Sequence, residues 1–285
     1  MTTIPLLNTD TQLTEIMNTL REKLSVNGAV PANWEDFEGW KLELDGRDLR
    51  VVLPQELAAG RPWFWRPEFF GAFANTDIAL LKRGWILVFL DVPNHYGCPK
   101  AVALFAGMYD FATETLGLSE KMAVVALSRA GLSGYNFASA HPDKVCAIYA
   151  DHPVCDFRTW PGGVGVSPRS AGNWENLLQA YGLSEAEALA DQKQPLAEAT
   201  LQPIVAAGIP VLHVCGDSDE VVPFEANTVL LRRQFKALGG DYQEIIVPGG
   251  KHHPHGLPNP APIVEFLESA FNHFSLNSCF TQIPR

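Results

Sequence analysis

Short, wholly apolar segments alternate with helical segments over most of this chain, and this alternation constrains the fold more than any other feature. Residues 85–90, 122–127 and 145–150 are apolar runs, whereas residues 101–115 and 132–140 have the apolar spacing of helices. A strand without polar alternation is covered on both faces, as in parallel sheets between helices. The sequence therefore predicts an α/β fold with a mostly parallel central sheet flanked by helices.

The second half of the chain continues the same rhythm. Residues 211–214 and 242–247 read as strands, and residues 225–238 and 261–274 read as helices. Of the 285 residues, 47% are hydrophobic and 19% charged, which suits a large buried core. We expect residues 1–285 to form a single domain, since α/β folds often reach this length as one unit.

The N-terminal part departs from this rhythm. Residues 1–33 are expected to form a helical extension, since apolar side chains from Leu13 to Leu24 recur at the spacing of one helical face. Residues 40–53 instead alternate between apolar and polar on both sides of an Asp-Gly pair, which is typical of a β-hairpin. The sheet should therefore begin with an antiparallel hairpin.

A long insertion interrupts the alternation between the strand ending at residue 150 and the strand beginning near residue 210. It is rich in Gly, Pro and Trp at first and helical in pattern afterwards. Long insertions inside a compact domain are usually lids or binding elements. Residues 157–202 are therefore predicted to form a cap.

Charge and composition limit the classes of partner. The formal net charge is −11, and an acidic surface repels nucleic acid phosphates and anionic lipid headgroups. The chain has no run of about 18 apolar residues, and its N-terminus lacks the basic and apolar regions of a signal peptide. We expect a cytoplasmic protein with neither a nucleic acid nor a membrane partner. Self-association into a homo-oligomer stays open.

The five cysteines give no sign of a disulfide framework. Their number is odd, their spacing is wide, and none belongs to a C-x-x-C pair. We expect all five to be reduced thiols, and they are Cys98, Cys146, Cys155, Cys215 and Cys279.

Ser128 lies between an apolar strand and a helix, which is where a nucleophile elbow places its serine. Such a turn needs small residues two positions before and after the serine, and here these are Ala126 and Ala130 in place of the usual glycines. The alternative reading is a serine that caps a helix. A nucleophilic serine also needs a histidine base and an acid that orients it.

Candidates for both partners follow in the chain order of an α/β-hydrolase, with the acid before the histidine. Asp217 and Asp219 come after the strand at 209–215, and His252 comes after the strand at 242–247. Carboxyl ends of parallel strands share one sheet edge, so these loops should meet at Ser128. The agreement of three separate segments favours the elbow over a helix cap.

Over residues 40–274 the chain resembles the prolyl-oligopeptidase-like and esterase-like branch of the α/β-hydrolase superfamily. The loop Gly216-Asp217-Ser218-Asp219-Glu220-Val221-Val222-Pro223 is similar to the acid loop of that family, and Pro248-Gly249-Gly250-Lys251-His252 is similar to its histidine loop. The resemblance implies a triad of Ser128, Asp219 and His252, with Asp217 stabilising its loop. Asp151 is the rival acid, because some members of the family take the acid from that position.

An oxyanion hole needs two N–H donors. The backbone of Arg129, directly after Ser128, should supply one. The other should come from the loop that contains Trp65, Arg66 and Pro67, and it falls to Trp65 or Arg66 because proline has no N–H.

Aromatic and polar residues near these loops are candidates for substrate binding. They lie in the oxyanion loop, after the strand at 85–90 and in the cap, and ordinary core packing is the alternative for each tryptophan. Arg66 and Arg129 are candidates for holding a carboxylate, and a salt bridge to Glu68 or another acid is the alternative. The substrate-binding candidates are Trp63, His95, Trp160 and Trp174.

The cluster His252-His253-Pro254-His255 shows no carboxylate at metal-binding spacing, so we predict no metal and no cofactor. The leading hypothesis is a serine esterase that acts through an acyl-enzyme on a small or carbohydrate-linked ester. The alternatives are a serine peptidase of short peptides and a catalytically silent binding protein with the hydrolase fold.

Overall fold

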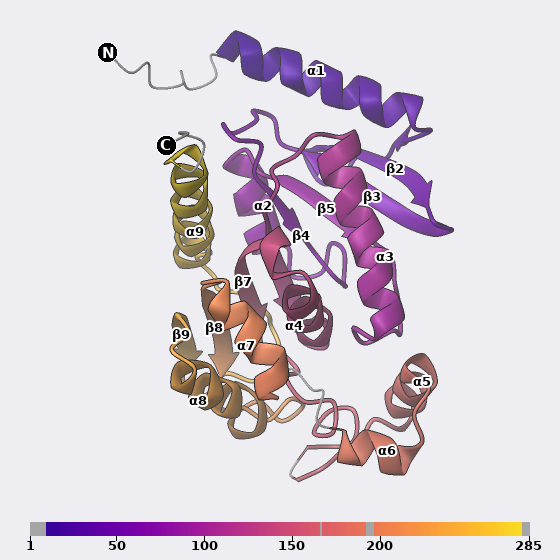
Figure 1. Ribbon diagram of the computed structural model, residues 1–285, viewed down its shortest axis with the longest axis vertical. Helices are drawn as coiled ribbons and strands as arrows, with labels where there is room; N and C mark the ends of the chain where they lie inside the picture. The colour runs from indigo at the N-terminus through magenta and orange to yellow at the C-terminus, as the bar shows by residue number, and fades with distance from the viewer. Residues whose placement is uncertain (1–9, 166, 192–196, 281–285) are drawn as a thin grey trace.

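One mixed sheet forms the centre of the molecule (Figure 1). The computed structural model describes residues 10–165, 167–191 and 197–280, and within these residues nine strands pair in the order β1-β2-β3-β5-β4-β6-β7-β8-β9. Residues 1–9 of the predicted N-terminal extension and residues 192–196 of the predicted cap lie outside the described residues. The strands are β1 (Val30–Pro31), β2 (Glu38–Leu44), β3 (Arg47–Leu53), β4 (Trp63–Trp65), β5 (Ile86–Leu90), β6 (Met122–Leu127), β7 (Val145–Asp151), β8 (Val211–Gly216) and β9 (Tyr242–Val247).

The sheet has an antiparallel end and a parallel end, as the sequence predicts. Strands β1, β2, β3 and β5 pair antiparallel, whereas β5, β4, β6, β7, β8 and β9 pair parallel. Asp45 and Gly46 join β2 to β3 with φ of 51° and 72°. Two successive positive φ angles define the turn that matches the strand twist of a hairpin, and Asp-Gly tolerates them well. The predicted hairpin is confirmed.

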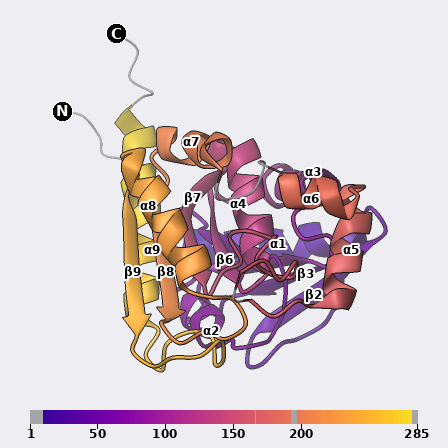
Figure 2. The ribbon, with the colours of Figure 1, turned by 90° about the horizontal axis from the view of Figure 1, so that it is seen from below.

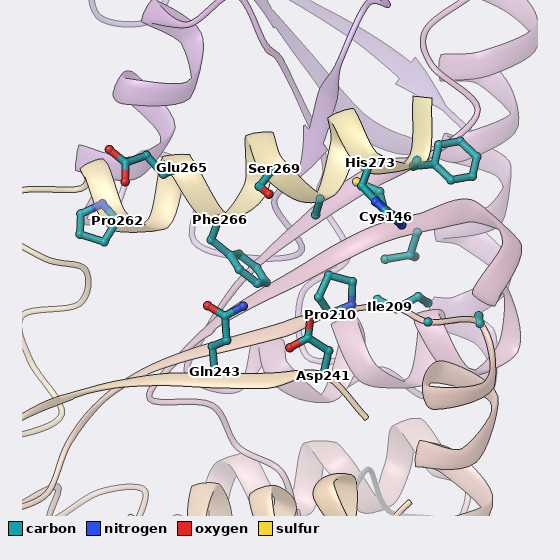
Figure 3. Close-up of a pocket in the computed structure, with 15 residues that line it drawn as sticks. Cys146, Ile209, Pro210, Asp241, Gln243, Pro262, Glu265, Phe266, Ser269 and His273 are labelled. Carbon is teal, nitrogen blue, oxygen red and sulfur yellow. The ribbon is translucent and has the colours of Figure 1, made fainter. Parts of the chain in front are cut away.

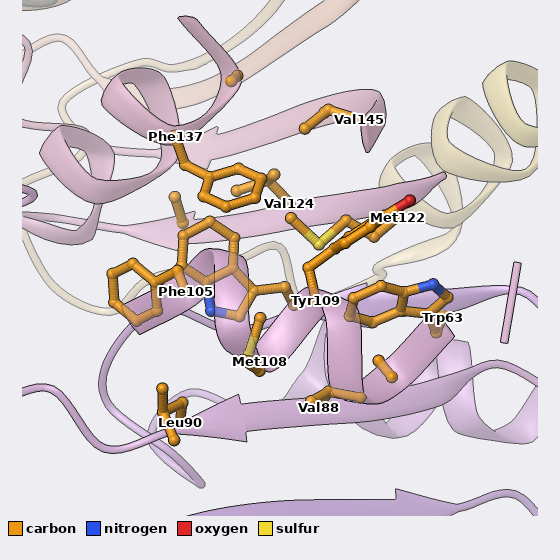
Figure 4. Close-up of a cluster of buried hydrophobic side chains, with 14 of the residues drawn as sticks. Trp63, Val88, Leu90, Phe105, Met108, Tyr109, Met122, Val124, Phe137 and Val145 are labelled. Atoms are coloured by element: carbon orange, nitrogen blue, oxygen red, sulfur yellow. The ribbon is translucent and has the colours of Figure 1, made fainter. Parts of the chain in front are cut away.

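Helices cover both faces of the sheet (Figure 1). On one face, side chains of α1, α3, α4, α7 and α8 belong to the largest apolar cluster, and on the other face α2 and α9 build a second cluster. Figure 4 shows the centre of the first cluster, where Trp63 and Phe105 pack among side chains of the sheet and of α4. The α-helices are α1 (Asp10–Val26), α2 (Asn75–Lys82), α3 (Pro99–Asp110), α4 (Ala130–Ala140), α5 (Ala171–Tyr181), α6 (Glu185–Ala190), α7 (Glu198–Ala206), α8 (Leu230–Ala237) and α9 (Ala261–Phe280).

Three short helical segments complete the described secondary structure. Two are π-helical and one is a 3-10 turn that leads into β7. They are η1 (Phe111–Thr115), η2 (Pro142–Lys144) and η3 (Glu225–Val229).

Helix α1 attaches to the body of the molecule through one apolar face. Met17, Leu20 and Leu24 are buried in the largest cluster, at the three- and four-residue spacing that places side chains on the same side of a helix. The predicted N-terminal helix is thus present from Asp10, and it crosses the end of the domain as the indigo ribbon of Figure 1.

Helices α5 and α6 stand apart from the sheet, at the lower right of Figure 1 and at the right of Figure 2. Trp174 and Leu177 of α5 form a small separate cluster with Tyr96 and Leu132. The end of α5 is set by Gly182 in the left-handed conformation. Helix α6 begins with a reciprocal capping box, in which Ser184 and the residue three positions later exchange hydrogen bonds.

The C-terminal end of the predicted cap, residues 157–202, overlaps the start of helix α7. Helix α7 begins at Glu198, and its Leu201 and Ile204 are buried in the main core against α4. Its apolar face therefore covers the sheet like those of the other flanking helices. The helical pattern of the insertion continues into α7, so the sequence offers no signal for this boundary.

Four cysteines are free and buried in the part of the chain that the structure describes, and the side chain of Cys279 lies outside it. Among the described helices, none is long and apolar enough to cross a membrane.

Candidate active site

Ser128 sits on a tight turn between β6 and α4. Its φ is +52°, a left-handed conformation that costs a residue with a Cβ some strain and that often occurs at functional sites. The turn is held from the β7 side, because the Ser128 amide donates to Asp151 O at 2.9 Å and the Val154 amide donates to Ser128 O at 2.9 Å. The backbone of Ser128 is therefore fixed to the end of β7 and to the loop that follows it.

Small residues make this turn possible. Ala126 and Ala130 are fully buried. A Cβ added to Gly131 would lie 2.8 Å from the Pro153 Cβ and 2.8 Å from the Val154 carbonyl oxygen, so the first turn of α4 packs directly on the loop after β7. The alanines found in place of the usual glycines thus fit the turn that the sequence predicts.

The loops after β8 and β9 are joined by their backbones. A Cβ on Gly216 would lie 2.1 Å from the Gly250 carbonyl oxygen, so only glycine allows this approach. The Ser218 amide donates to that same oxygen at 3.0 Å, and the carboxylate of Asp217 accepts a hydrogen bond from the Gly249 amide at 2.7 Å. These contacts hold the two loops together at the carboxyl edge of the sheet.

The structure brings Asp219 and His252 of these two loops together with Ser128 in one chain of hydrogen bonds. Ser128 Oγ lies 2.9 Å from His252 Nε2, and His252 Nδ1 lies 2.7 Å from Asp219 Oδ2. The other carboxylate oxygen of Asp219 accepts the amides of Val221 and Val222, each at 2.8 Å. The acid is therefore fixed by its own loop while it orients the imidazole.

The pKa of Asp219 reflects these contacts. Burial acts to raise the pKa, but the hydrogen bonds from His252 and from two backbone amides outweigh it and hold the pKa below its ordinary value. Asp219 thus stays ionised at neutral pH and stabilises a positive charge on His252.

Asp151, the rival acid, is bonded to two other histidines. It is buried at the end of β7 and makes no hydrogen bond to His252 among the described residues. Burial would raise its pKa, yet the histidine bonds hold that pKa well below the ordinary value. Four groups donate to its carboxylate: Tyr149 Oη at 2.7 Å, His152 Nδ1 at 2.8 Å, His255 Nδ1 at 2.6 Å and the Gly256 amide at 2.9 Å.

A pocket of about 310 Å³ opens beside Ser128 and His252. It combines aromatic walls with a few polar groups, as small-molecule sites usually do. Its lining residues are Phe69, Ala72, Phe73, Leu127, Ser128, Arg129, Trp160, Asn173, Val221, His252, His253 and His255.

A larger groove, of about 770 Å³, lies at the opposite end of the sheet between the start of β8 and helix α9 (Figure 3). Its lining includes two residues of nucleophile type, Cys146 and Ser269. Burial raises the pKa of the Cys146 thiol to about 12, so this thiol stays protonated. The three hydrogen-bonded residues Ser128, Asp219 and His252 are not part of this lining.

No protein-family model matches the sequence, and no curated protein is significantly similar to it. Solved structures do match the fold. A puromycin-hydrolyzing peptidase of Mycobacterium tuberculosis superposes with a TM-score of 0.61 at 14% identity, covering 81% of this chain and 38% of the other. The Pyrococcus horikoshii acylaminoacyl peptidase gives 0.59 at 14% identity, covering 76% and 38%. Est1E from Butyrivibrio proteoclasticus gives 0.55 at 19% identity, covering 84% and 98%.

The chain has the α/β-hydrolase fold. It spans only about two fifths of the length of the two peptidases, whereas it matches nearly the whole of Est1E. The predicted fold class is confirmed, including the antiparallel N-terminal strands.

In this hydrolase fold the predicted second oxyanion donor is misplaced. The Arg66 amide already donates to Val88 O at 3.1 Å, so it is not free to bind an oxyanion. Trp65 lies inside β4, paired with Val88 on one side and Val124 on the other, and its ring packs on Phe105 in the core. Neither residue lines the pocket.

Of the four predicted substrate-binding residues, one lines the pocket and three do not. Trp160 lines the pocket. Trp63 is fully buried in the core and donates to Ser119 O, and Trp174 is buried in the small cluster beneath α5. His95 lies outside the pocket lining, with its Nδ1 2.6 Å from the Pro93 carbonyl oxygen. Trp63, Trp174 and His95 therefore do not line this pocket.

The two arginines form ion pairs rather than standing free to hold a substrate carboxylate. Arg66 is buried against Asp77 at 2.7 Å. Arg129 pairs with Glu68 at 2.6 Å and donates to Asn173 Oδ1 at 3.0 Å. Arg129 still borders the pocket, whereas Arg66 holds the loop after β4 by donating to carbonyl oxygens within it.

Several pocket residues were not identified from the sequence. Phe69 and Phe73 have positive φ angles of 59° and 50°, which place their rings at the pocket, and the aromatic-rich stretch 69–73 was the available signal. Asn173 comes from α5 and had no distinguishing signal. His253 was noted in the sequence only as part of a histidine cluster.

Proposed function

We propose that this chain is a serine hydrolase that cleaves carboxylic esters through an acyl-enzyme. The observation that carries the proposal is the continuous hydrogen-bonded series Ser128–His252–Asp219 at a strained strand-to-helix turn. This is the arrangement that turns a weak hydroxyl nucleophile into a reactive one.

In the first half-reaction, Ser128 Oγ attacks the ester carbonyl carbon while His252 Nε2 takes the hydroxyl proton. Asp219 accepts the Nδ1 proton in a hydrogen bond and stabilises the imidazolium ion, without itself becoming protonated. Collapse of the tetrahedral intermediate breaks the bond to the alcohol oxygen, and His252 returns the proton to that oxygen. The acyl group remains on Ser128.

The oxyanion of that intermediate needs two donors. The Arg129 amide follows the nucleophile at the N-terminus of α4, where the helix dipole also favours negative charge. For the second donor we assign the Phe69 amide. Arg66 donates elsewhere, Pro67 has no N–H, and Phe69 is the first residue of this loop that lines the pocket.

In the second half-reaction, a water molecule attacks the acyl carbon with His252 as base. The acid is released, and Ser128 recovers its proton from His252. The reaction consumes one ester and one water and yields one carboxylic acid and one alcohol.

The pocket favours a small acyl group or a carbohydrate-linked ester. Its volume of about 310 Å³ is at the lower end for small-molecule sites. Phe69, Phe73 and Trp160 offer aromatic faces for an acyl chain or a sugar ring, while Asn173 and Arg129 are the polar groups at the same surface.

A peptidase of short peptides is the second candidate. Two of the structural neighbours are described as peptidases, and the same serine, histidine and acid would also cleave an amide. An amide needs stronger protonation of its leaving nitrogen than an ester needs for its leaving oxygen, so the two activities separate on matched substrates.

The test compares hydrolysis of p-nitrophenyl acetate with that of p-nitroacetanilide, which share an acyl group. The native chain should cleave the ester, cleave the anilide far more slowly and lose ester cleavage in Ser128→Ala. Ser139→Ala, a change on the same helix outside the pocket, is the matched control and should keep the activity. Equal ester cleavage by the native chain and folded Ser128→Ala would overturn the proposal, and efficient anilide cleavage would favour the peptidase.

A further inference from the structure

Three imidazoles converge at the edge of the pocket. His252, His253 and His255 all line it, and one nitrogen from each lies within 4.8 Å of the other two. Their ring centroids are 4.8 to 4.9 Å apart. Phe73 packs against His253 and His255 and gives the cluster an apolar wall.

Two of these imidazoles are held by a carboxylate on the side away from the cluster. Asp219 Oδ2 lies 2.7 Å from His252 Nδ1, and Asp151 Oδ1 lies 2.6 Å from His255 Nδ1. Histidines that bind metals nearly always donate their second N–H to such a partner, which fixes the tautomer and makes the other nitrogen a better ligand. The sequence predicts the pairing of Asp219 with His252 but not that of Asp151 with His255, because these two residues are 104 positions apart in the chain.

A second group of possible metal ligands lies next to this cluster, but its ligand atoms are not available to a metal ion. Asp151, His152 and His255 also bring their ligand atoms within 4.8 Å of one another. The Gly216 amide donates to His152 Nε2 at 2.7 Å, so the proton of this ring is on Nδ1 and bonds to Asp151. The ligand atoms of Asp151, His152 and His255 are thus already hydrogen-bonded to one another. The side of the histidines that faces the pocket is the one open to a cation.

We propose that His252, His253 and His255 bind one Zn²⁺ ion at the pocket edge and that the bound ion switches off the serine. Zinc–nitrogen bonds of about 2.0–2.1 Å in a tetrahedral site place the ligand nitrogens about 3.4 Å apart. The exposed side chain of His253 closes the remaining distance by rotating. Imidazole ligands suit zinc, whereas Mg²⁺ and Ca²⁺ prefer oxygen.

The consequence for catalysis rests on the proposed function. The Nδ1 proton of His252 is committed to Asp219, so the metal binds Nε2, which is the atom that otherwise receives the Ser128 proton. An imidazole bound to zinc has no lone pair for that proton. Zinc therefore inhibits reversibly, and a chelator restores the activity.

Calorimetric titration of Zn²⁺ into Ser128→Ala tests the site without any need for hydrolysis. We expect one ion per chain, and no binding of Mg²⁺ under the same conditions. Adding His253→Gln or His255→Gln to Ser128→Ala should weaken zinc binding by about tenfold or more. His273→Gln, an exposed histidine of α9 outside the cluster, is the matched control and should leave the affinity unchanged.

Absence of saturable zinc binding to folded Ser128→Ala would overturn the site, as would equal affinities in the His253→Gln and His273→Gln variants. Because His253 is exposed, its replacement keeps the test valid even where His255→Gln fails to fold. In the native chain, zinc should abolish hydrolysis of p-nitrophenyl acetate, and excess EDTA should restore it. Zinc binding without any esterase activity would count against the proposed function alone, and full activity in zinc-saturated protein would overturn the inhibition.

Discussion

Two buried aspartates at the carboxyl edge of the sheet, Asp219 and Asp151, are each bonded to histidine, and they differ in what those histidines reach. Asp219 holds His252, whose other nitrogen lies 2.9 Å from Ser128 Oγ. Asp151 holds His255, and it also accepts bonds from Tyr149 and two other donors. Both acids occupy positions that the sequence offered for the triad.

The difference teaches that chain position alone does not assign a catalytic acid. Asp219 is bonded to backbone amides of its own loop and to a single imidazole, so removing its charge affects mainly that imidazole. Asp151 joins β7 to the histidine loop through donors on both sides, so removing its charge affects the fold. Removing the charge of Asp219 should therefore reduce mainly the activity, and removing that of Asp151 should reduce mainly the stability.

The largest expected effect is the loss of activity in Asp219→Asn. An amide at this position cannot stabilise the imidazolium and favours the wrong tautomer, so we expect kcat/KM for p-nitrophenyl acetate to fall on the order of 10³- to 10⁴-fold. Asp151→Asn, measured alongside, should lose less than about tenfold. A reversal of this order would make Asp151 the acid.

The second effect is on stability. In Asp151→Asn, an NH2 group replaces one carboxylate oxygen, so two of the four donors lose their acceptor in a buried site. We expect urea unfolding to show a free energy of unfolding lower by about 1–3 kcal/mol. Asp219→Asn keeps an oxygen for its two backbone amides and should lose less. Equal losses of unfolding free energy in Asp151→Asn and Asp219→Asn would contradict the proposed difference between the two aspartates.

The third effect concerns acid pH. Because the pKa of Asp151 is lowered in the folded chain, its contribution to stability is complete above the unfolded pKa of about 3.9 and is lost as the pH falls through the folded pKa. Between roughly pH 4 and pH 2, the native chain should lose stability more steeply than Asp151→Asn. Urea midpoints measured across this range give the slopes, and parallel slopes would contradict the assignment.

The smallest effect is expected at Asp217, which lies two residues before Asp219 but is exposed. It accepts hydrogen bonds from the Gly249 amide and from Ser218 Oγ. Asp217→Asn should lower the free energy of unfolding by about 0.5 kcal/mol or less. Ester hydrolysis should stay within about twofold of native. A large loss of activity would show that Asp217, and not its neighbour, acts on His252.

The fold was predictable because its signals are local. Buried parallel strands leave uninterrupted apolar runs, and Asp45-Gly46 marks its hairpin within a few residues. The prediction that Ser128, Asp219 and His252 meet depended on the rule that loops after parallel strands lie at one edge, and the choice of Asp219 over Asp217 depended on the resemblance to the family's acid loop.

The lining of the pocket was not predictable in the same way. Trp63, Trp160 and Trp174 are the same residue type in similar surroundings of sequence, yet only Trp160 reaches the pocket. Which face of a strand or helix is covered depends on elements far away in the chain. The partners of Arg129 and His255 are likewise set by tertiary contacts that no local pattern encodes.

Labelling with a fluorophosphonate, followed by intact mass and peptide mapping, tests the central claim most directly. We expect one phosphonyl group per native chain, located on Ser128, and none on Ser128→Ala. The rate of labelling should fall steeply in Asp219→Asn and little in Asp151→Asn. A label on another residue, or unchanged labelling of Ser128→Ala, would contradict the assignment of Ser128 as the nucleophile.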